Sequence, residues 1–149
     1  MRECSNCRRS SWFFVVLIAL VGVWLGDATG AGIDSVTPGK GRWPMFRGGP
    51  SLAGVAPGRL ADQLELRWRF ETGGPVRSSA AVDAGVAYVG SDDGQVYAVG
   101  LENGEKVWAF DTGDMVESSP LLLGGRVYVG SANGKLYALE RSSGKVAWE

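Results

Sequence analysis

The sequence of 149 residues contains no histidine, and its only two cysteines, Cys4 and Cys7, lie near the N-terminus. Without histidine the chain lacks the commonest metal ligand and the side chain best suited to proton transfer near neutral pH, so carboxylates would have to carry any acid–base chemistry. The formal net charge is −1, and no stretch gathers five or more like charges. This balance excludes a polybasic arm and argues against nucleic acid as a partner.

Cys4 and Cys7 form a CxxC pair, which in other settings indicates a zinc site or a redox pair. No second pair is present to complete a tetrahedral zinc site, and the pair precedes a long apolar run. We therefore interpret it as part of a targeting segment and assign no metal ligand. No cysteine follows the apolar run, so a lipid-attachment site of the lipoprotein type is absent.

Residues 1–30 have the three-part order of a secretory signal. A basic start is followed by the apolar run WFFVVLIALVGVWLG at residues 12–26 and the small residues ATGA at 28–31. As a helix the run spans roughly 22 Å, short of a ~30 Å hydrocarbon core, which favours cleavage; an uncleaved signal anchor is the alternative. We predict an exported protein, periplasmic or extracellular, that starts between residues 27 and 33 and contacts the membrane only if the segment is uncleaved.

A repeat of 40 residues dominates the rest of the chain. Residues 68–107 align without a gap over residues 108–147 with 16 identities, and Trp148 opens a third copy on the same phase. Turn signals at TGG/TGD, AG/GG, SDDG/SANG and ENG/SSG cut each copy into four short strands. Four strands in about 40 residues are typical of a β-propeller blade. The sequence therefore predicts an all-β fold, an incomplete β-propeller of four-stranded antiparallel blades.

The expected organisation is a Gly/Pro-rich extended segment over residues 31–63 and a partial propeller over residues 64–149. Residues 64–73 read as the last strand of a preceding blade, and residues 76–111 and 116–149 as two adjacent sheets with Trp108 buried between them. Because known propellers use about four to eight blades, we expect the chain to be an N-terminal fragment that is not stable in isolation.

Two segments carry a resemblance to a known family. AVGLENGEKVW (98–108) and ALERSSGKVAW (138–148) resemble the tryptophan-docking motif AxDxxTGKxxW of PQQ-like, quinoprotein-type propellers. Gly100 and Glu140 replace the usual Asp, and Asn103 and Ser143 the usual Thr. The resemblance implies blade-docking roles for residues recurring at the repeat period, which are Trp68, Trp108, Trp148, Ala98, Ala138, Gly104 and Gly144.

Upstream, WPMFRGGPSLAG (43–54) is similar to the WPxFRG segment that precedes the first blade in bacterial secreted propellers. This resemblance implies that Trp43, Phe46 and Arg47 dock the N-terminal segment onto the propeller. A lone arginine beside glycines could instead bind a carboxylate ligand. We favour docking, because an extended Gly- and Pro-rich segment is held only by its side chains.

Other polar and aromatic positions admit a structural and a functional interpretation. The recurring tryptophans could stack on a quinone or sugar, but a large flat residue every 40 positions is what packing between blades requires. Asp92, Asp93 and Asn133 could bind Ca²⁺, but they also suit turns next to glycine. Without histidine as a base, a nucleophilic role is excluded for the serines at four positions in register, which are Ser78, Ser79, Ser118 and Ser119.

Three functions follow from these features. The first is a non-enzymatic binding or assembly scaffold of the cell envelope, with a protein or other envelope component as partner. The second, implied only by the resemblance, is a PQQ-dependent dehydrogenase; no catalytic residue, metal ligand or cofactor site for it can be assigned. The third is a surface module that binds carbohydrate or another cell-wall component.

Overall fold

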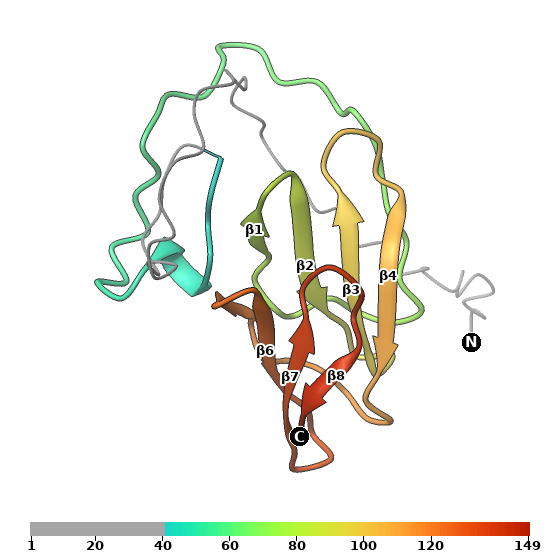
Figure 1. Cartoon of the computed structure of the whole chain (residues 1–149). Coiled ribbons are helices and arrows are strands. Elements are labelled where there is room, and N and C mark those ends of the chain that lie inside the picture. Colours follow the sequence, from blue (N-terminus) through green and yellow to red (C-terminus); the bar gives the residue numbers. More distant parts are fainter. Residues whose placement is uncertain (1–40) are drawn as a thin grey trace, which may run out of the picture.

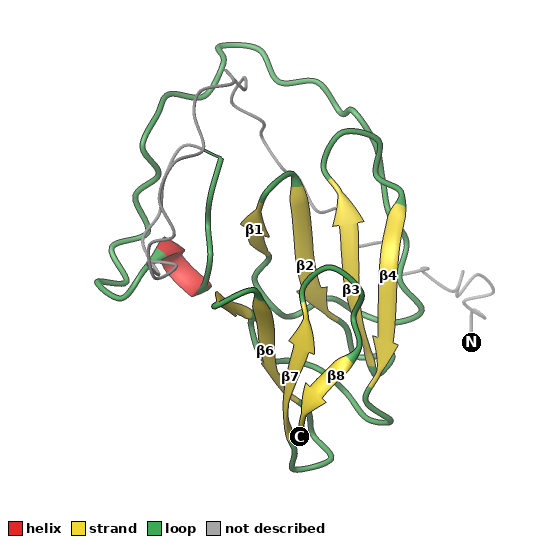
Figure 2. Ribbon diagram, viewed as in Figure 1, coloured by secondary structure: helices red, strands yellow, loops and turns green. Residues whose placement is uncertain are grey.

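The computed structural model describes residues 41–149. The predicted export signal and the first part of the Gly/Pro-rich segment lie outside the described residues. In the described part, two four-stranded antiparallel sheets lie side by side (Figures 1 and 2). The first has the order β1 (Ala81–Asp83), β2 (Val86–Gly90), β3 (Gln95–Gly100) and β4 (Lys106–Asp111). The second has the order β5 (Leu121–Leu123), β6 (Arg126–Gly130), β7 (Leu136–Glu140) and β8 (Val146–Trp148).

Each sheet is a simple meander, as the evenly spaced turn signals predict. The first hairpin of each blade turns through two residues with positive φ, Ala84 (48°) and Gly85 (76°) in one copy and Gly124 (58°) and Gly125 (76°) in the other. Two consecutive residues of this kind form the tight turn that matches the twist of antiparallel strands. The register is repeated too, since Tyr88 pairs with Ala98 in one blade and Tyr128 with Ala138 in the other.

The hydrophobic core lies between the two blades. The first blade contributes one face of its sheet, including Tyr88, Val96 and Trp108, and the second blade contributes the facing side chains, which include Leu122, Val127, Val129, Tyr137 and Leu139. Trp108 is only 8% exposed. The predicted fold class, an all-β chain with two antiparallel blades of an open propeller, is confirmed. In the described part of the chain, no helix is both long and apolar enough to span a membrane.

Residues 64–73, which the sequence predicts as the last strand of a preceding blade, have no partner strand in the described part of the chain. They carry no ladder hydrogen bonds within the described residues. Side chains attach this segment instead: the rings of Phe70 and Tyr97 lie 5.3 Å apart, edge to face, and Trp68 packs on Gly104. The segment therefore lies against the face of the first sheet.

Candidate functional site on the loop face

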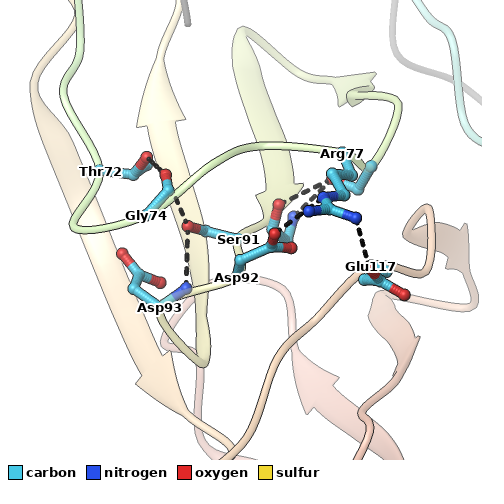
Figure 3. Close-up of polar contacts among 9 residues, drawn as sticks. Thr72, Gly74, Arg77, Ser91, Asp92, Asp93 and Glu117 are labelled. Atoms are coloured by element: carbon cyan, nitrogen blue, oxygen red, sulfur yellow. Dashed lines mark hydrogen bonds and ion pairs between the residues drawn. The ribbon is translucent and has the colours of Figure 1, made fainter. Parts of the chain in front are cut away.

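In both blades, the segment before the first strand and the turn between the second and third strands lie at the same end of the sheet. We call this end, formed by residues 71–79, 91–94, 111–119 and 131–134, the loop face. The polar side chains shown in Figure 3 come from three of these four segments. The opposite end carries the β1–β2 and β3–β4 turns and their equivalents in the second blade.

Asp93 and Asn133 occupy the same position of the two repeats and organise the loops. Asp93 accepts a hydrogen bond from the Gln95 amide (3.0 Å) through Oδ1, and from the Gly73 amide and the Tyr97 hydroxyl (both 2.7 Å) through Oδ2. Asn133 Oδ1 accepts from the Lys135 amide (2.9 Å). Its Nδ2 donates to the Thr112 carbonyl and the Tyr137 hydroxyl at 2.6 and 2.7 Å. Each residue thus closes its turn, as the turn interpretation predicts, and ties it to the preceding loop.

Asp92 has a different role, because the turn does not need its carboxylate. Ala132 stands at the equivalent position, yet the backbone is the same: the Asp92 amide donates to the Pro75 carbonyl (2.9 Å) and the Ala132 amide to that of Met115 (2.8 Å). The Asp92 side chain is 8% exposed and accepts from Arg77 Nε at 2.9 Å. Its other oxygen is buried and has no hydrogen-bond donor among the described residues.

Arg77 extends this pair across the boundary between the blades. Its Nη1 lies 3.3 Å from Glu117 Oε1, and Glu117 is the repeat equivalent of Arg77 itself (Figure 3). The Arg77 and Glu117 side chains are 63% and 54% exposed. Such exposed pairs contribute little to stability, about 0–1 kcal/mol. The main effect of this cluster is therefore on the charge pattern of the loop face. One guanidinium between two carboxylates gives the cluster a net charge of −1.

The repeated serines hold the loops to the sheets. Ser78 Oγ donates to the Gly90 carbonyl and accepts from the Gly90 amide, both at 2.9 Å. Ser118 makes the same two bonds with Gly130 at 2.8 Å. The Ser79 amide donates to Ser119 Oγ at 2.9 Å and links the two blades. These hydroxyls serve backbone hydrogen bonding within and between the blades.

Two of the three recurring tryptophans have the same surroundings. Trp68 Nε1 donates to the Leu101 carbonyl (2.8 Å), and Trp108 Nε1 donates to the Arg141 carbonyl (2.9 Å). A Cβ placed on Gly104 or Gly144 would lie 2.7 Å from the ring of Trp68 or Trp108, respectively. Each indole therefore packs directly on a glycine that follows it by 36 residues, and that ring face is closed to a ligand. Ala98 and Ala138, which pair across the strands with Trp108 and Trp148, are fully buried, whereas the third tryptophan, Trp148, is 42% exposed.

The WPMFRGG segment packs through its first residues. The ring of Trp43 lies on Gly48, which has a φ of 86°. Phe46 is exposed, and Arg47 adopts a φ of 56° with its carbonyl accepting from the Gly54 amide at 3.1 Å. This bond closes a turn within the N-terminal segment itself, so the docking of Phe46 and Arg47 onto the propeller stays a prediction. Whether the Arg47 guanidinium also binds a ligand stays a prediction.

We expect the stability of the folded chain to fall as the pH rises from about 10 to about 12. Burial raises the pKa of Tyr88 to about 12, and burial with the hydrogen bond to Asp93 raises the pKa of Tyr97 to about 12. The folded state therefore holds these protons more tightly than the unfolded chain, whose tyrosines ionise near 10. The stability that these two tyrosines contribute is fully present below about pH 10 and is lost by about pH 12.

Urea unfolding at a series of pH values measures this loss. Tyr128 provides the matched control, because it is the repeat equivalent of Tyr88 in the second blade. Tyr88→Phe should reduce the loss of stability between about pH 10 and about pH 12 more than Tyr128→Phe does. Equal declines in the two variants would contradict the assignment.

Comparisons with known proteins agree with this architecture. A protein-family model described as outer membrane protein assembly factor BamB matches residues 59–149. The fold is similar to that of quinohemoprotein alcohol dehydrogenase from Comamonas testosteroni, with 25% identity, a TM-score of 0.63, and coverage of 73% of this chain and 19% of that chain. It is also similar to BamB from Moraxella catarrhalis, with 22% identity, a TM-score of 0.50, and coverage of 54% and 25%. The chain thus spans a quarter or less of those structures. No protein of curated function matches the sequence significantly.

Proposed function

This chain belongs to the PQQ-like β-propeller repeat family of the outer membrane protein assembly factor BamB, and from that premise we propose that it is an exported, non-enzymatic scaffold of the cell envelope. Its partner is an envelope protein that binds the loop face. Propellers supply rigid loops held by repeated units, and the function resides in the surface that those loops carry.

The observation that carries this proposal is how the polar groups of the loop face are used. Asp93, Asn133, Ser78 and Ser118 are engaged in hydrogen bonds that hold the loops in place. A preordered loop loses little conformational entropy when a partner binds, which favours affinity. Arg77 and Glu117 remain exposed on these fixed loops, where they set the charge pattern that a partner meets.

The polar cluster in Figure 3 offers little to the quinone cofactor of the alternative enzymatic function. Pyrroloquinoline quinone is a flat polycarboxylate and needs cationic groups around it. Arg77 is the one cation of the cluster in Figure 3, and Asp92 and Glu117 already neutralise it. The likeness to a quinohemoprotein alcohol dehydrogenase keeps a dehydrogenase as the second candidate function. Tight, stoichiometric binding of the quinone by the purified protein, followed by its absorbance, would favour that candidate.

Site-specific photocrosslinking in intact cells tests the scaffold function. A crosslinker at Glu117 should form an adduct with one envelope protein, because this side chain projects from the loop face. A crosslinker placed instead at Met115, an exposed residue of the same loop, should also capture that protein. Glu117→Arg should reduce this capture on the order of tenfold, since charge complementarity governs the encounter of two proteins.

Glu102 is the matched control, because it is an exposed glutamate in the turn at the other end of the first sheet. A crosslinker at Glu102 should not capture the same protein, and Glu102→Arg should leave capture unchanged. Adducts with polysaccharide alone would instead support a carbohydrate-binding module, and equal protein capture from both ends would contradict the proposal.

A further inference from the structure

The N-terminal segment crosses the first strand of each blade. We call residues 42–49 the clasp and β1 and β5 the inner strands. Each inner strand is only three residues long and pairs with one neighbour in its own sheet, which leaves its other edge open. An unpaired edge exposes backbone hydrogen-bonding groups, and proteins cover such edges or keep them short. The clasp lies on both of these edges.

Backbone hydrogen bonds join the clasp to equivalent positions of the two blades. The Trp43 amide donates to the Val82 carbonyl and the Val82 amide to the Trp43 carbonyl, both at 2.8 Å. The next residue reaches the other blade, since the Leu122 amide donates to the Pro44 carbonyl at 2.8 Å. Val82 and Leu122 are 40 residues apart, one full repeat. Two consecutive residues of the clasp therefore bond the same position of successive blades, and the Pro44 side chain is fully buried between them.

Charged groups make a second connection at the end of β1. Asp83 Oδ1 lies 3.5 Å from Arg42 Nε in the clasp, and Asp83 Oδ2 accepts a hydrogen bond from Arg141 in the second blade. All three side chains are largely buried, with exposures between 17% and 29%. One carboxylate thus joins the clasp, the first blade and the second blade.

We propose that the clasp is a built-in device that sets the placement of the first blade relative to the second. The inner strands are where the blades come closest to the clasp, and the loops that carry Arg77 and Glu117 end at residues 79 and 119, two positions before these strands begin. A shift of β1 against β5 would move the two loops apart. The clasp therefore holds the loop face in register, whichever partner the loop face binds.

Amide hydrogen exchange followed by NMR in the full chain tests this inference, because exchange reports local opening of individual hydrogen bonds. The variant is Gly48→Ala, since a Cβ at this position would lie 2.8 Å from the Trp43 ring and the backbone has a φ of 86°. Exchange at the Val82 and Leu122 amides should rise together, at least about tenfold. Exchange at Val89 and Val129, which lie in central strands, should not change.

Gly41→Ala is the matched control. Its φ is 73°, but nothing lies within 4 Å of the added Cβ, so it tests the backbone strain without the ring contact. If Gly48→Ala unfolds the chain, Asp83→Asn provides a milder variant that weakens both arginine contacts and should again raise exchange at Val82 and Leu122 together. A rise at Val82 with no change at Leu122, or the same rise in Gly41→Ala, would overturn the proposal.

Discussion

Gly144→Ala should lower the free energy of unfolding by about 3 kcal/mol, the sum of a left-handed backbone cost of about 1–2 kcal/mol and an overpacking cost of about 1–3 kcal/mol. The backbone at Gly144 has a φ of 68°, and an added Cβ would lie 2.7 Å from ring atoms of Trp108. That ring is held between the blades by the core and by its bond to the Arg141 carbonyl, so it cannot move aside cheaply. Urea unfolding of the purified protein and of the variant measures this loss of stability.

Gly125→Ala separates the two causes. Its φ of 76° is close to that of Gly144, but nothing lies within 4 Å of its Cβ position. This variant should therefore lose only the backbone cost, about 1–2 kcal/mol. Equal losses of stability in the two variants would show that the close contact between Gly144 and Trp108 does not affect the stability.

Trp108→Ala should destabilise the chain by about 4 kcal/mol, because truncating a buried aromatic residue removes its apolar contacts and leaves a cavity. Trp108 lies in the core between the blades, with its ring 5.8 Å from that of Tyr88. Its indole also donates the hydrogen bond to Arg141. Trp108→Phe should recover most of the loss but not the contribution of that hydrogen bond, about 1 kcal/mol. The same unfolding experiment measures all three proteins.

Val107 provides the control from the neighbouring position of the same strand. Its side chain is 53% exposed, so Val107→Ala should cost well under about 1.5 kcal/mol, the least expected for a fully buried valine. A loss in Trp108→Ala no larger than that in Val107→Ala would contradict the placement of Trp108 at the centre of the interface.

Much of the fold could be predicted because the same turn-forming and strand-forming residues occur in both copies of the repeat. The turn glycines at residues 94 and 134 have φ values of 88° and 84°, and both follow an Asp or Asn that closes the turn. Residues 64–73 were predicted as a strand from the same pattern. Within the described residues they have no neighbouring backbone to pair with, so this strand stays a prediction.

The charged cluster of the candidate site could not be predicted as readily from the sequence. The pattern identified Asp92 as a turn residue beside Asp93, but its carboxylate binds Arg77, which in turn reaches Glu117. One signal could have found this cluster. Where the two copies of the repeat are compared, Arg77 stands over Glu117 and Asp92 over Ala132, so these positions change charge while Ser78, Ser91 and Gly94 beside them are the same in both copies.

The sequence by itself determined the number and order of strands in each blade and the positions of the turns. These features depend on the conformational freedom of glycine and on the strand preference of β-branched and aromatic residues, which act over a few neighbouring positions. Only the tertiary structure decided that Trp43 and Pro44 bond to Val82 and Leu122, and that Asp83 joins both blades to the clasp. Those contacts connect residues about 40 to 80 positions apart, and they exist because packing two blades face to face brings their inner strands within reach of one extended segment.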